Sequence, residues 1–583
     1  MEEQSVAPAA SVADEAAAAS ENKGKVSRRG LFGAAAVVGV AGAAVAANRS
    51  VPALAAARAG GGEAPAKAPD LILTNGDFHT MDAKNSVVGE VGVRDGKIVS
   101  VGRKGQLRRG DAQLIDVKGA TVVPGLIEGH VHSVSLANRP GYHVVIENAR
   151  NIAEIQAMLA ARRKDVPEGQ FITAMGGWST NFFTERRLPT LAELDAAVSD
   201  RPVFLYGGGI GRTNTLGKRW FESQTPAVTV ADDGTMAGGP AGQNNLALYH
   251  LRAKQTFEDK RRSALDCMAY SASLGLTAHL DQTLPPDSGP LSPKQGLGNL
   301  NNFRMYDPWL SLHREGKAFI RLQMNFLHDQ NDMALPELHE RLKNQFQLFG
   351  DDMMMTGGIG EWGAPGDGEG PVWLEAQRII AEARWRNTNR TLNAKGLEDI
   401  ISGYEKIHAK YDISGLRWTI HHVPFATVEQ LNRMKAMNVG VQSGCWRYVG
   451  GVPGNAGAPF RLIMDSGIKN GIHMDGVHIA PLNPWMAVYY AATGVNSLGV
   501  QVNGDQNITR QEALRLYTRE NAWHLNMEDR LGSLEPGKHA DLTVLNRNYM
   551  TCTDEELKRM APVMTLVGGK VVHDTGALGG RRA

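Results

Sequence analysis

Short apolar runs separated by turn residues occupy both ends of the chain. Residues 71–73, 91–93 and 97–101 are apolar or alternate with polar positions, and Asn-Gly and Asp-Gly pairs lie between them. The same pattern returns at residues 540–545 and 564–572. Such runs, bounded by such pairs, predict short strands joined by tight turns. Neither end holds enough strands for a stable β domain, so we expect the two ends to build one together.

Between the two ends, short apolar strands alternate with amphipathic helices. This order, continued over residues 122–530, predicts an α/β fold with a parallel sheet, and its length is typical of a (β/α)8 barrel with insertions. An open doubly wound sheet is the alternative, and it is less favoured because no GxGxxG motif follows an early strand. The predicted strands are residues 171–174, 203–206, 276–280, 320–324, 418–422 and 439–442, and the predicted helices are residues 152–163, 336–349, 397–411 and 428–437.

The first part of the chain has the layout of a targeting segment. Arg28 and Arg29 precede an uncharged run of mostly Gly, Ala and Val at residues 30–47, and Ala-Leu-Ala follows at residues 53–55. This pattern predicts a twin-arginine signal with a small-residue cleavage site. An N-terminal membrane anchor is the alternative, but a run so rich in Gly and Ala would be a poor one. We therefore expect export by the twin-arginine machinery to the periplasm or the outside, with no stable membrane span after signal cleavage.

These patterns divide the chain into six parts. A twin-arginine signal region (residues 1–59) and a linker (60–68) come first, and a tail (576–583) comes last. Between them we expect the first part of a composite β-sandwich (69–121), the barrel (122–530) and the second part of the sandwich (531–575).

Composition excludes several classes of protein. The 583 residues include 62 Lys and Arg against 61 Asp and Glu, a formal net charge of +1, so binding to a nucleic-acid backbone through long-range electrostatics is not expected. Three cysteines without CxxC spacing indicate neither a disulfide framework nor a thiolate zinc site. What remains is a globular protein.

The most informative segment is Val-Val-Pro-Gly-Leu-Ile-Glu-Gly-His-Val-His, residues 122–132. In a strand, residues i and i+2 share a face, so His130 and His132 can direct both imidazoles to one point. Two neutral imidazoles there can chelate one divalent metal. His-x-His alone is weak evidence, but the lead-in and the position at a strand's end strengthen it.

At this point the chain resembles the metal-dependent amidohydrolase superfamily. Residues 122–132 are similar to its entry motif, and the similarity continues through Gly-Gly-Trp at 176–178, Arg-Leu-Pro-Thr at 187–190 and the segment 531–542. The second and third motifs resemble the branch that includes N-substituted formamide deformylases. The resemblance implies a TIM-like barrel with a composite β-sandwich, and hydrolysis of C–N bonds by metal-activated water.

The resemblance also implies roles for single residues. His130 and His132 match the metal ligands of strand 1, and His422 in Thr-Ile-His-His matches the ligand of strand 6. Asp475 in His-Met-Asp-Gly matches the catalytic carboxylate of strand 8. His421 points the other way if its strand is regular, whereas His473 shares the face of Asp475 and lies beneath it.

Two positions depart from the family pattern. Glu361 is the only candidate ligand where relatives usually carry a bridging Lys, and Asn393 replaces the His of strand 5. We therefore expect one Zn2+ or similar ion, held by His130, His132 and some of the other three candidates, Glu361, His422 and Asp475. The Asn393 amide could instead orient the substrate. Trp178 is a candidate substrate contact in a pocket that Phe182, Phe183, Trp362 and Trp446 could also line.

These residues favour an exported amidohydrolase acting on a small amide or cyclic amide. Asp475 would serve as general base and acid, and His422, if it is not a ligand, would polarise the scissile carbonyl. One alternative is a non-hydrolytic single-metal enzyme, such as a decarboxylase, hydratase or isomerase. Another is a pseudoenzyme that binds a ligand without turnover, because the fold alone does not separate these functions.

Overall fold

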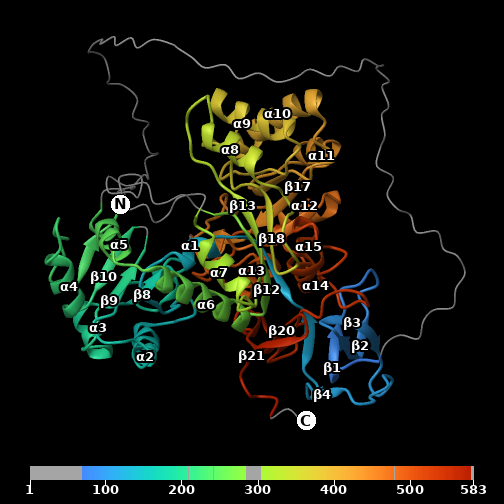
Figure 1. Ribbon diagram of the computed structural model, residues 1–583, viewed down its shortest axis with the longest axis horizontal. Coiled ribbons are helices and arrows are strands. Elements are labelled where there is room, and N and C mark those ends of the chain that lie inside the picture. Colours follow the sequence, from blue (N-terminus) through green and yellow to red (C-terminus); the bar gives the residue numbers. More distant parts are fainter. Residues whose placement is uncertain (1–67, 208, 240–241, 284–303, 478, 580–583) are drawn as a thin grey trace, which may run out of the picture. The chain divides into compact units, whose positions relative to one another are not determined.

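The computed structural model describes residues 68–207, 209–239, 242–283, 304–477 and 479–579 (Figure 1). The predicted signal region, residues 1–59, and most of the predicted linker, residues 60–68, lie outside this part of the chain. None of the helices in the described ranges combines the length and the apolar character that a bilayer span requires.

Eight parallel strands form the centre of the fold. They belong to two four-stranded sheets, ordered β14-β13-β12-β6 and β15-β16-β17-β18, in which every pairing is parallel. Isolated parallel bridges at Val131↔Gly476 and Ile359↔Asn387 join the sheets at both edges, so the strands form a closed ring. The strands are β6 (Leu126–Val131), β12 (Leu276–Asp281), β13 (Arg321–Phe326), β14 (Met354–Ile359), β15 (Thr388–Arg390), β16 (Thr419–His422), β17 (Gly440–Gly444) and β18 (Asn470–His473). The predicted α/β class is confirmed.

Helices follow the ring strands and bury their apolar stripes against them. Thr427 begins α11 with a capping box to Gln430, and Gly403 lets α10 approach α9, since a Cβ there would lie 2.5 Å from the Trp373 ring. The helices are α6 (Phe257–Ser273), α7 (Asp307–Arg314), α8 (Pro336–Asn344), α9 (Pro371–Glu382), α10 (Ala394–Tyr411), α11 (Val428–Ala436), α12 (Phe460–Ser466), α13 (Pro484–Thr493), α14 (Arg510–Arg515), α15 (Asn521–His524) and α16 (Asp554–Leu557). Two 3-10 helices, η3 (Trp446–Tyr448) and η4 (Gly504–Gln506), and a π-helix, η5 (Leu516–Glu520), lie among them.

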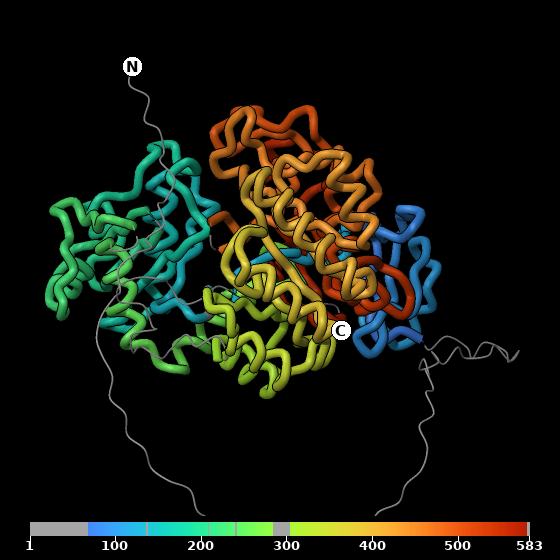
Figure 2. The backbone as a smooth tube through the Cα atoms, turned by 90° about the horizontal axis from the view of Figure 1, so that it is seen from above, coloured from blue at the N-terminus to red at the C-terminus, as the bar shows by residue number. Residues whose placement is uncertain are grey.

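The two ends of the described chain share one eight-stranded sheet, ordered β21-β20-β19-β5-β1-β2-β3, with β4 paired to β1. β5 and β19 pair antiparallel and thereby join the ends, which lie side by side as blue and red segments in Figure 2. A buried ion pair of 2.7 Å between Arg321 and Asp541 ties this sheet to the ring. The strands are β1 (Leu71–His79), β2 (Val87–Arg94), β3 (Lys97–Gly102), β4 (Gln113–Asp116), β5 (Thr121–Pro124), β19 (Leu542–Leu545), β20 (Pro562–Val567) and β21 (Lys570–Asp574). That this sheet folds as a sandwich stays a prediction.

A separate five-stranded sheet, ordered β11-β10-β9-β8-β7, is inserted between β6 and β12. It contains the strands predicted at residues 171–174 and 203–206, so these do not belong to the ring. Hydrophobic pattern alone does not tell which sheet a buried strand joins, because pairing is a long-range contact. The elements of this insertion are α1 (Ser133–Ala137), β7 (Tyr142–His143), α2 (Ile152–Arg163), β8 (Ile172–Met175), η1 (Thr180–Phe182), α3 (Leu191–Ala197), β9 (Val203–Tyr206), β10 (Ile210–Thr213), α4 (Thr215–Glu222), β11 (Thr235–Ala237) and α5 (Gln243–Ala253).

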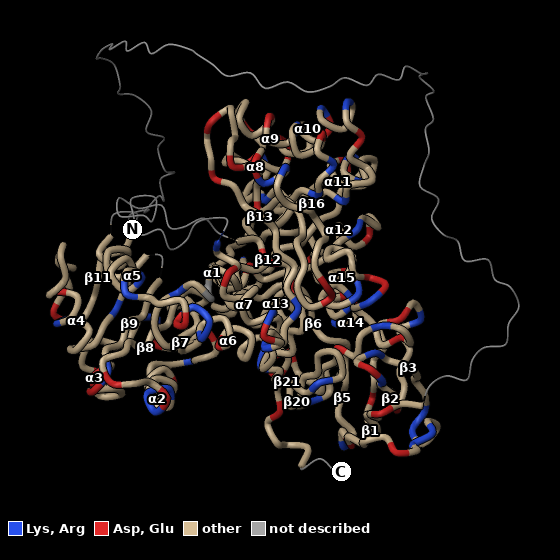
Figure 3. Tube along the Cα trace, in the orientation of Figure 1, with Lys and Arg blue, Asp and Glu red and all other residues tan. Residues whose placement is uncertain are grey.

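Charged residues of both signs occur on the outer helices, for example α2 and α8 to α11 (Figure 3). This distribution is what the nearly equal numbers of acidic and basic residues lead one to expect.

Candidate metal centre

Five of the predicted site residues meet where the ring strands end. His130 and His132 come from the end of β6, Glu361 follows β14, His422 closes β16, and Asp475 follows β18. All five side chains are buried, with at most 5% of each exposed. In parallel rings of this kind the carboxyl ends of the strands are where catalytic groups gather.

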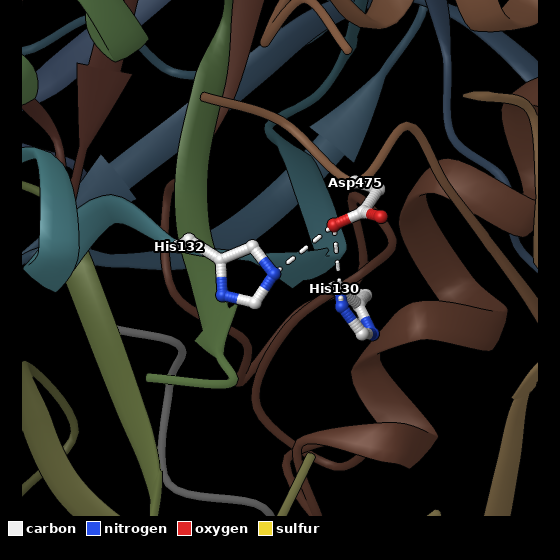
Figure 4. Close-up of side chains that lie close together, drawn as sticks. All are labelled: His130, His132 and Asp475. Carbon is white, nitrogen blue, oxygen red and sulfur yellow. Dashed lines mark ion pairs between the residues drawn. The ribbon is translucent and has the colours of Figure 1, made fainter. Parts of the chain in front are cut away.

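Asp475 lies between the two imidazoles of β6. Its Oδ1 atom is 3.1 Å from His132 Nε2 and 3.4 Å from His130 Nε2, and Figure 4 shows both rings turned toward this one oxygen. The sequence separation between these residues is large, yet the closed ring places β6 beside β18. The strand-1 imidazoles and the distant acid therefore face one point.

Glu361 approaches the same imidazoles from another strand. Its Oε1 atom is 3.9 Å from His130 Nε2 and 3.8 Å from His422 Nε2, and its Oε2 atom is 3.8 Å from His132 Nε2. His422 also lies 3.9 Å from Asp475 Oδ2. The two carboxylates thus flank the three ring nitrogens.

The backbone leaves regular strand geometry at two of these residues. His422 has φ +69° and Asp475 has φ +64°, both in the left-handed region that residues other than Gly rarely adopt. The consecutive residues His421 and His422 both contact groups of the centre, His422 through Glu361 and His421 through His130. His421 is expected to point the other way only if its strand is regular. His421 instead contacts His130, and the backbone departs from regular strand geometry at His422. Such conformations cost of order 1–3 kcal/mol and are commonly found at functional sites.

Two further imidazoles support His130 from behind. His421 Nδ1 lies 2.6 Å from His130 Nδ1, and the His473 ring stacks on the His130 ring with centroids 4.7 Å apart and planes inclined by 24°. Burial and the neighbouring imidazoles lower the pKa of His421 and of His473 far below the ordinary value. Both imidazoles are therefore neutral at pH 7.

The electrostatics keep the two carboxylates charged. Burial alone would raise the pKa of the Asp475 carboxyl, but His130 and His132 hold it well below its usual range. Burial alone would likewise raise the pKa of the Glu361 carboxyl. That pKa is instead held below its usual value by the side chains of His422, His130, His132 and Arg390. Burial lowers the pKa of the His130 imidazole, so its neutral form, which has a lone pair to offer, is favoured.

The donor set suits a divalent metal. Among the described residues, none is a hydrogen-bond partner of the buried atoms His130 Nε2 and Asp475 Oδ1. Two groups of three ligand atoms lie close enough to hold one ion, namely His130, His132 and Asp475, and His130, Glu361 and His422. Ligands about 2.0–2.1 Å from a tetrahedral zinc ion lie about 3.3 Å apart, near the 3.1 and 3.4 Å found here. The residues therefore fit the ion that the sequence predicts, but they do not select zinc over similar ions.

Asn393 and Trp178, the predicted substrate residues, have other contacts. Asn393 is the N-cap of α10, and its Oδ1 atom accepts a hydrogen bond of 2.8 Å from Gly396 N. Trp178 packs in the inserted sheet against Gly207. These contacts explain why both residues suit their local structure, and the substrate roles stay predictions.

The other predicted aromatic residues divide into two groups. Trp446 meets His422 edge-on with centroids 6.2 Å apart, and Trp362 directly follows Glu361. Phe183 is fully buried in the core of the insertion, and Phe182 contacts Tyr448. The two tryptophans are therefore the aromatic side chains that border the centre.

Sequence reasoning missed Arg390. It closes β15, three residues before Asn393, and its Nε atom lies 3.2 Å from Glu361 Oε1. A cationic side chain at the end of a ring strand is the signal that could have identified it.

Comparisons with known proteins identify a family whose model matches most of the chain. Residues 113–573 match the model of the amidohydrolase family. The chain is 24% identical to an N-substituted formamide deformylase from Arthrobacter pascens over 546 residues, which cover 87% of this chain and 98% of the relative.

Two solved structures share the fold. One is an uncharacterized metal-dependent hydrolase from Pyrococcus furiosus, with 18% identity and a TM-score of 0.55 over 82% of this chain and 99% of the other. The second is an atrazine chlorohydrolase from Arthrobacter aurescens complexed with zinc, with 15% identity and a TM-score of 0.50 over 86% and 95%. At these identities the likeness concerns the fold alone.

Proposed function

This chain belongs to the amidohydrolase family, and from that premise we propose that it is a metal-dependent hydrolase of a C–N bond in a small amide or cyclic amide. The observation that carries the proposal is the convergence of His130 and His132 on Asp475 Oδ1, at 3.4 and 3.1 Å. The name of the relative from Arthrobacter pascens supports N-substituted formamides as the first substrates to examine.

The chain's own residues would hold one divalent ion, for which we propose Zn2+. His130 and His132 would bind through Nε2, and Asp475, Glu361 or His422 would complete the set. When bound, the ion would bring the pKa of a coordinated water to about 7, so that a nucleophile exists at neutral pH.

Asp475 has the properties of the proton carrier. Its imidazole neighbours hold the pKa of its carboxyl well below the usual range, so at neutral pH it is ionised and can accept the proton of the attacking water. It can then pass that proton to the departing nitrogen. His422, 3.9 Å from Asp475 Oδ2, is close enough to orient or polarise a substrate carbonyl if it does not serve as a ligand.

Metal analysis together with a substrate panel tests this function. Protein expressed with ample zinc should contain about one ion per chain, and it should hydrolyse members of a panel of N-formyl, N-acyl and cyclic amides. Absence of metal would favour a ligand-binding pseudoenzyme. Bound metal without hydrolysis of any panel member would favour a decarboxylase, hydratase or isomerase.

We also propose that the protein leaves the cytoplasm by the twin-arginine route. The support is the Arg28–Arg29 pair before the uncharged run at residues 30–47. Residues 1–59 fused to a reporter should direct it to the periplasm or the medium, and replacing both arginines with Lys should retain it inside. Export that is unaffected by the double replacement would exclude this route.

A further inference from the structure

Arg390 links the metal centre to an acidic residue outside it. Its Nε atom lies 3.2 Å from Glu361 Oε1, and its Nη1 atom lies 3.0 Å from Asp367 Oδ1. Its guanidinium carbon sits 4.8 Å from the centroid of the Trp362 ring. One planar cation thus contacts two carboxylates and one aromatic face.

Glu361 lies between this cation and the imidazoles. Its carboxylate is nearly fully buried, and the same Oε1 atom that faces Arg390 also faces His130 and His422 at 3.9 and 3.8 Å. A buried carboxylate that has no cation beside it tends to take up a proton or to turn away. Arg390 supplies a permanent positive charge beside the Glu361 carboxylate, 3.2 Å from the Oε1 atom that also faces the imidazoles.

The planar shape of Arg390 determines what it can hold. Nε and Nη1 point in different directions in one rigid plane, so the side chain can engage Glu361 and Asp367 at the same time. The Trp362 ring lies against that plane and limits its rotation. Since Trp362 is the neighbour of Glu361 in the chain, the cation contacts both the Glu361 carboxylate and the segment that carries it.

We propose that Arg390 is a positioning residue that fixes the Glu361 carboxylate against the imidazoles of the metal centre. The inference rests on the proposed function, because it assumes that the centre holds a divalent ion. It adds that affinity for this ion depends on a guanidinium that does not itself touch the ion. Partners of metal ligands that act in this way typically change metal affinity about 10–100-fold when they are removed.

The test measures zinc affinity in the whole chain, by competition with a chromophoric chelator, for the wild type and for Arg390→Gln, Arg390→Lys and Asp367→Asn. Arg433→Gln is the matched control. Arg433 has 24% of its side chain exposed, against 26% for Arg390, and it also contacts two carboxylates, those of Glu398 and Glu405. The melting temperature of each metal-free variant is measured alongside, to separate loss of fold from loss of affinity.

Arg390→Gln should weaken zinc binding about 10–100-fold, with a metal-free melting temperature close to that of Arg433→Gln. The zinc affinity of Arg390→Lys should lie between those of Arg390→Gln and the wild type. Lys keeps the positive charge but lacks the planar guanidinium that engages two carboxylates at once. Asp367→Asn should weaken binding less than Arg390→Gln, and Arg433→Gln should leave affinity unchanged.

Two outcomes would overturn the inference. One is a zinc affinity of Arg390→Gln equal to that of the wild type, and the other is a loss of zinc affinity in the control Arg433→Gln as large as that in Arg390→Gln. A wild-type chain that binds no divalent metal would instead contradict the proposed function. The two failures are therefore distinguishable.

Discussion

The Nδ1 atom of His130 lies 2.6 Å from the Nδ1 atom of His421. With a metal at His130 Nε2, the Nδ1 atom of His130 carries the hydrogen and donates it, so His421 Nδ1 accepts. The hydrogen of His421 is then on Nε2, which lies 3.2 Å from Thr419 Oγ1. Thr419 Oγ1 is in turn 3.1 Å from Thr388 Oγ1. This chain of hydrogen bonds fixes the tautomer and the ring plane of His130.

Replacing His421 should therefore weaken metal binding. His421→Phe keeps a ring of similar size but removes the acceptor for His130, and we expect a loss of about 10–100-fold in zinc affinity. The control is His279→Phe, because His279 is also a buried imidazole, on β12, and its ring nitrogens have no hydrogen-bond partner in the part of the chain that the structure describes. Chelator competition measures both variants, and equal affinities would contradict the role given to His421.

Replacing Asp475 should lower the turnover rate far more than it affects the folding of the chain. Asp475→Asn removes the proton acceptor while it keeps the side-chain volume, so kcat should fall by about 10²–10⁴-fold. Zinc content should be largely retained, because the imidazoles of His130 and His132 remain. Steady-state kinetics and metal analysis of the same sample check both points. Unchanged turnover would remove Asp475 from the mechanism.

Metal binding should stabilise the folded chain. An ion that binds only the native state at a free concentration of 100 times its Kd adds about 2.7 kcal/mol to the free energy of unfolding. Zinc added to chelator-treated protein should raise the melting temperature and restore activity. His132→Ala should lose most of this rise, whereas His573→Ala, on β21 in the eight-stranded sheet, should keep it. A rise of equal size in both variants would place the ion elsewhere.

A buried acid in the insertion predicts a pH dependence of stability. Glu147 is 2% exposed, and its carboxylate accepts hydrogen bonds from Leu482 N, Asn483 N and the Tyr270 hydroxyl. Burial raises the pKa of Glu147 from 4.5 to about 7, although these hydrogen bonds oppose the rise. Between these values the folded chain keeps a proton that the unfolded chain has lost. Stability should therefore fall as the pH rises from 4.5 to about 7 and then level off.

The size of this effect is about 1.4 kcal/mol per pH unit for one proton. Glu147→Gln removes the titrating group, so its stability should fall less steeply over the same range. Urea unfolding at a series of pH values measures both slopes, and Glu168→Gln, at an exposed position, is the control. Parallel slopes for the wild type and Glu147→Gln would show that Glu147 does not titrate in this range.

Asn393 allows its two roles to be separated. Asn393→Ala removes the N-cap of α10 and should cost about 0.5–2 kcal/mol of stability, whereas Asn393→Ser keeps a capping oxygen. If Asn393 only caps the helix, Asn393→Ser should match the wild type in kcat/KM as well as in urea unfolding. A lower kcat/KM with unchanged stability and metal content would support the predicted contact with substrate.

Local sequence patterns predicted much of the fold. Helix α2 has the predicted bounds of residues 152–163, and β9 has those of residues 203–206. Helix α8 instead ends at Asn344, before the predicted residue 349, because Thr356 of β14 accepts a hydrogen bond from Phe349 N and holds that segment as a turn. Contacts of this kind join residues on different elements, and periodicity does not report them.

In the candidate site, too, local motifs predicted some residues, whereas contacts between different elements could not be predicted. The i, i+2 spacing of His130 and His132 and the motifs around His422 and Asp475 identified groups that the structure brings together. The backbone of His422 has a positive φ, which the residue types around it do not predict. The contact of His421 with His130 could therefore not be predicted from the local pattern. The role of Arg390 depends on its contact with Glu361, which follows a different ring strand. Only the three-dimensional structure shows that contact.

The two four-stranded sheets of the ring meet through one isolated bridge at each edge, and the candidate ligands come from both of them. His130, His132 and Glu361 belong to the first sheet, and His422 and Asp475 to the second. An ion held by members of both sets would cross-link the two halves, as a disulfide bond joins distant segments of a chain. Binding would then restrict the separation of the halves and make their unfolding more cooperative.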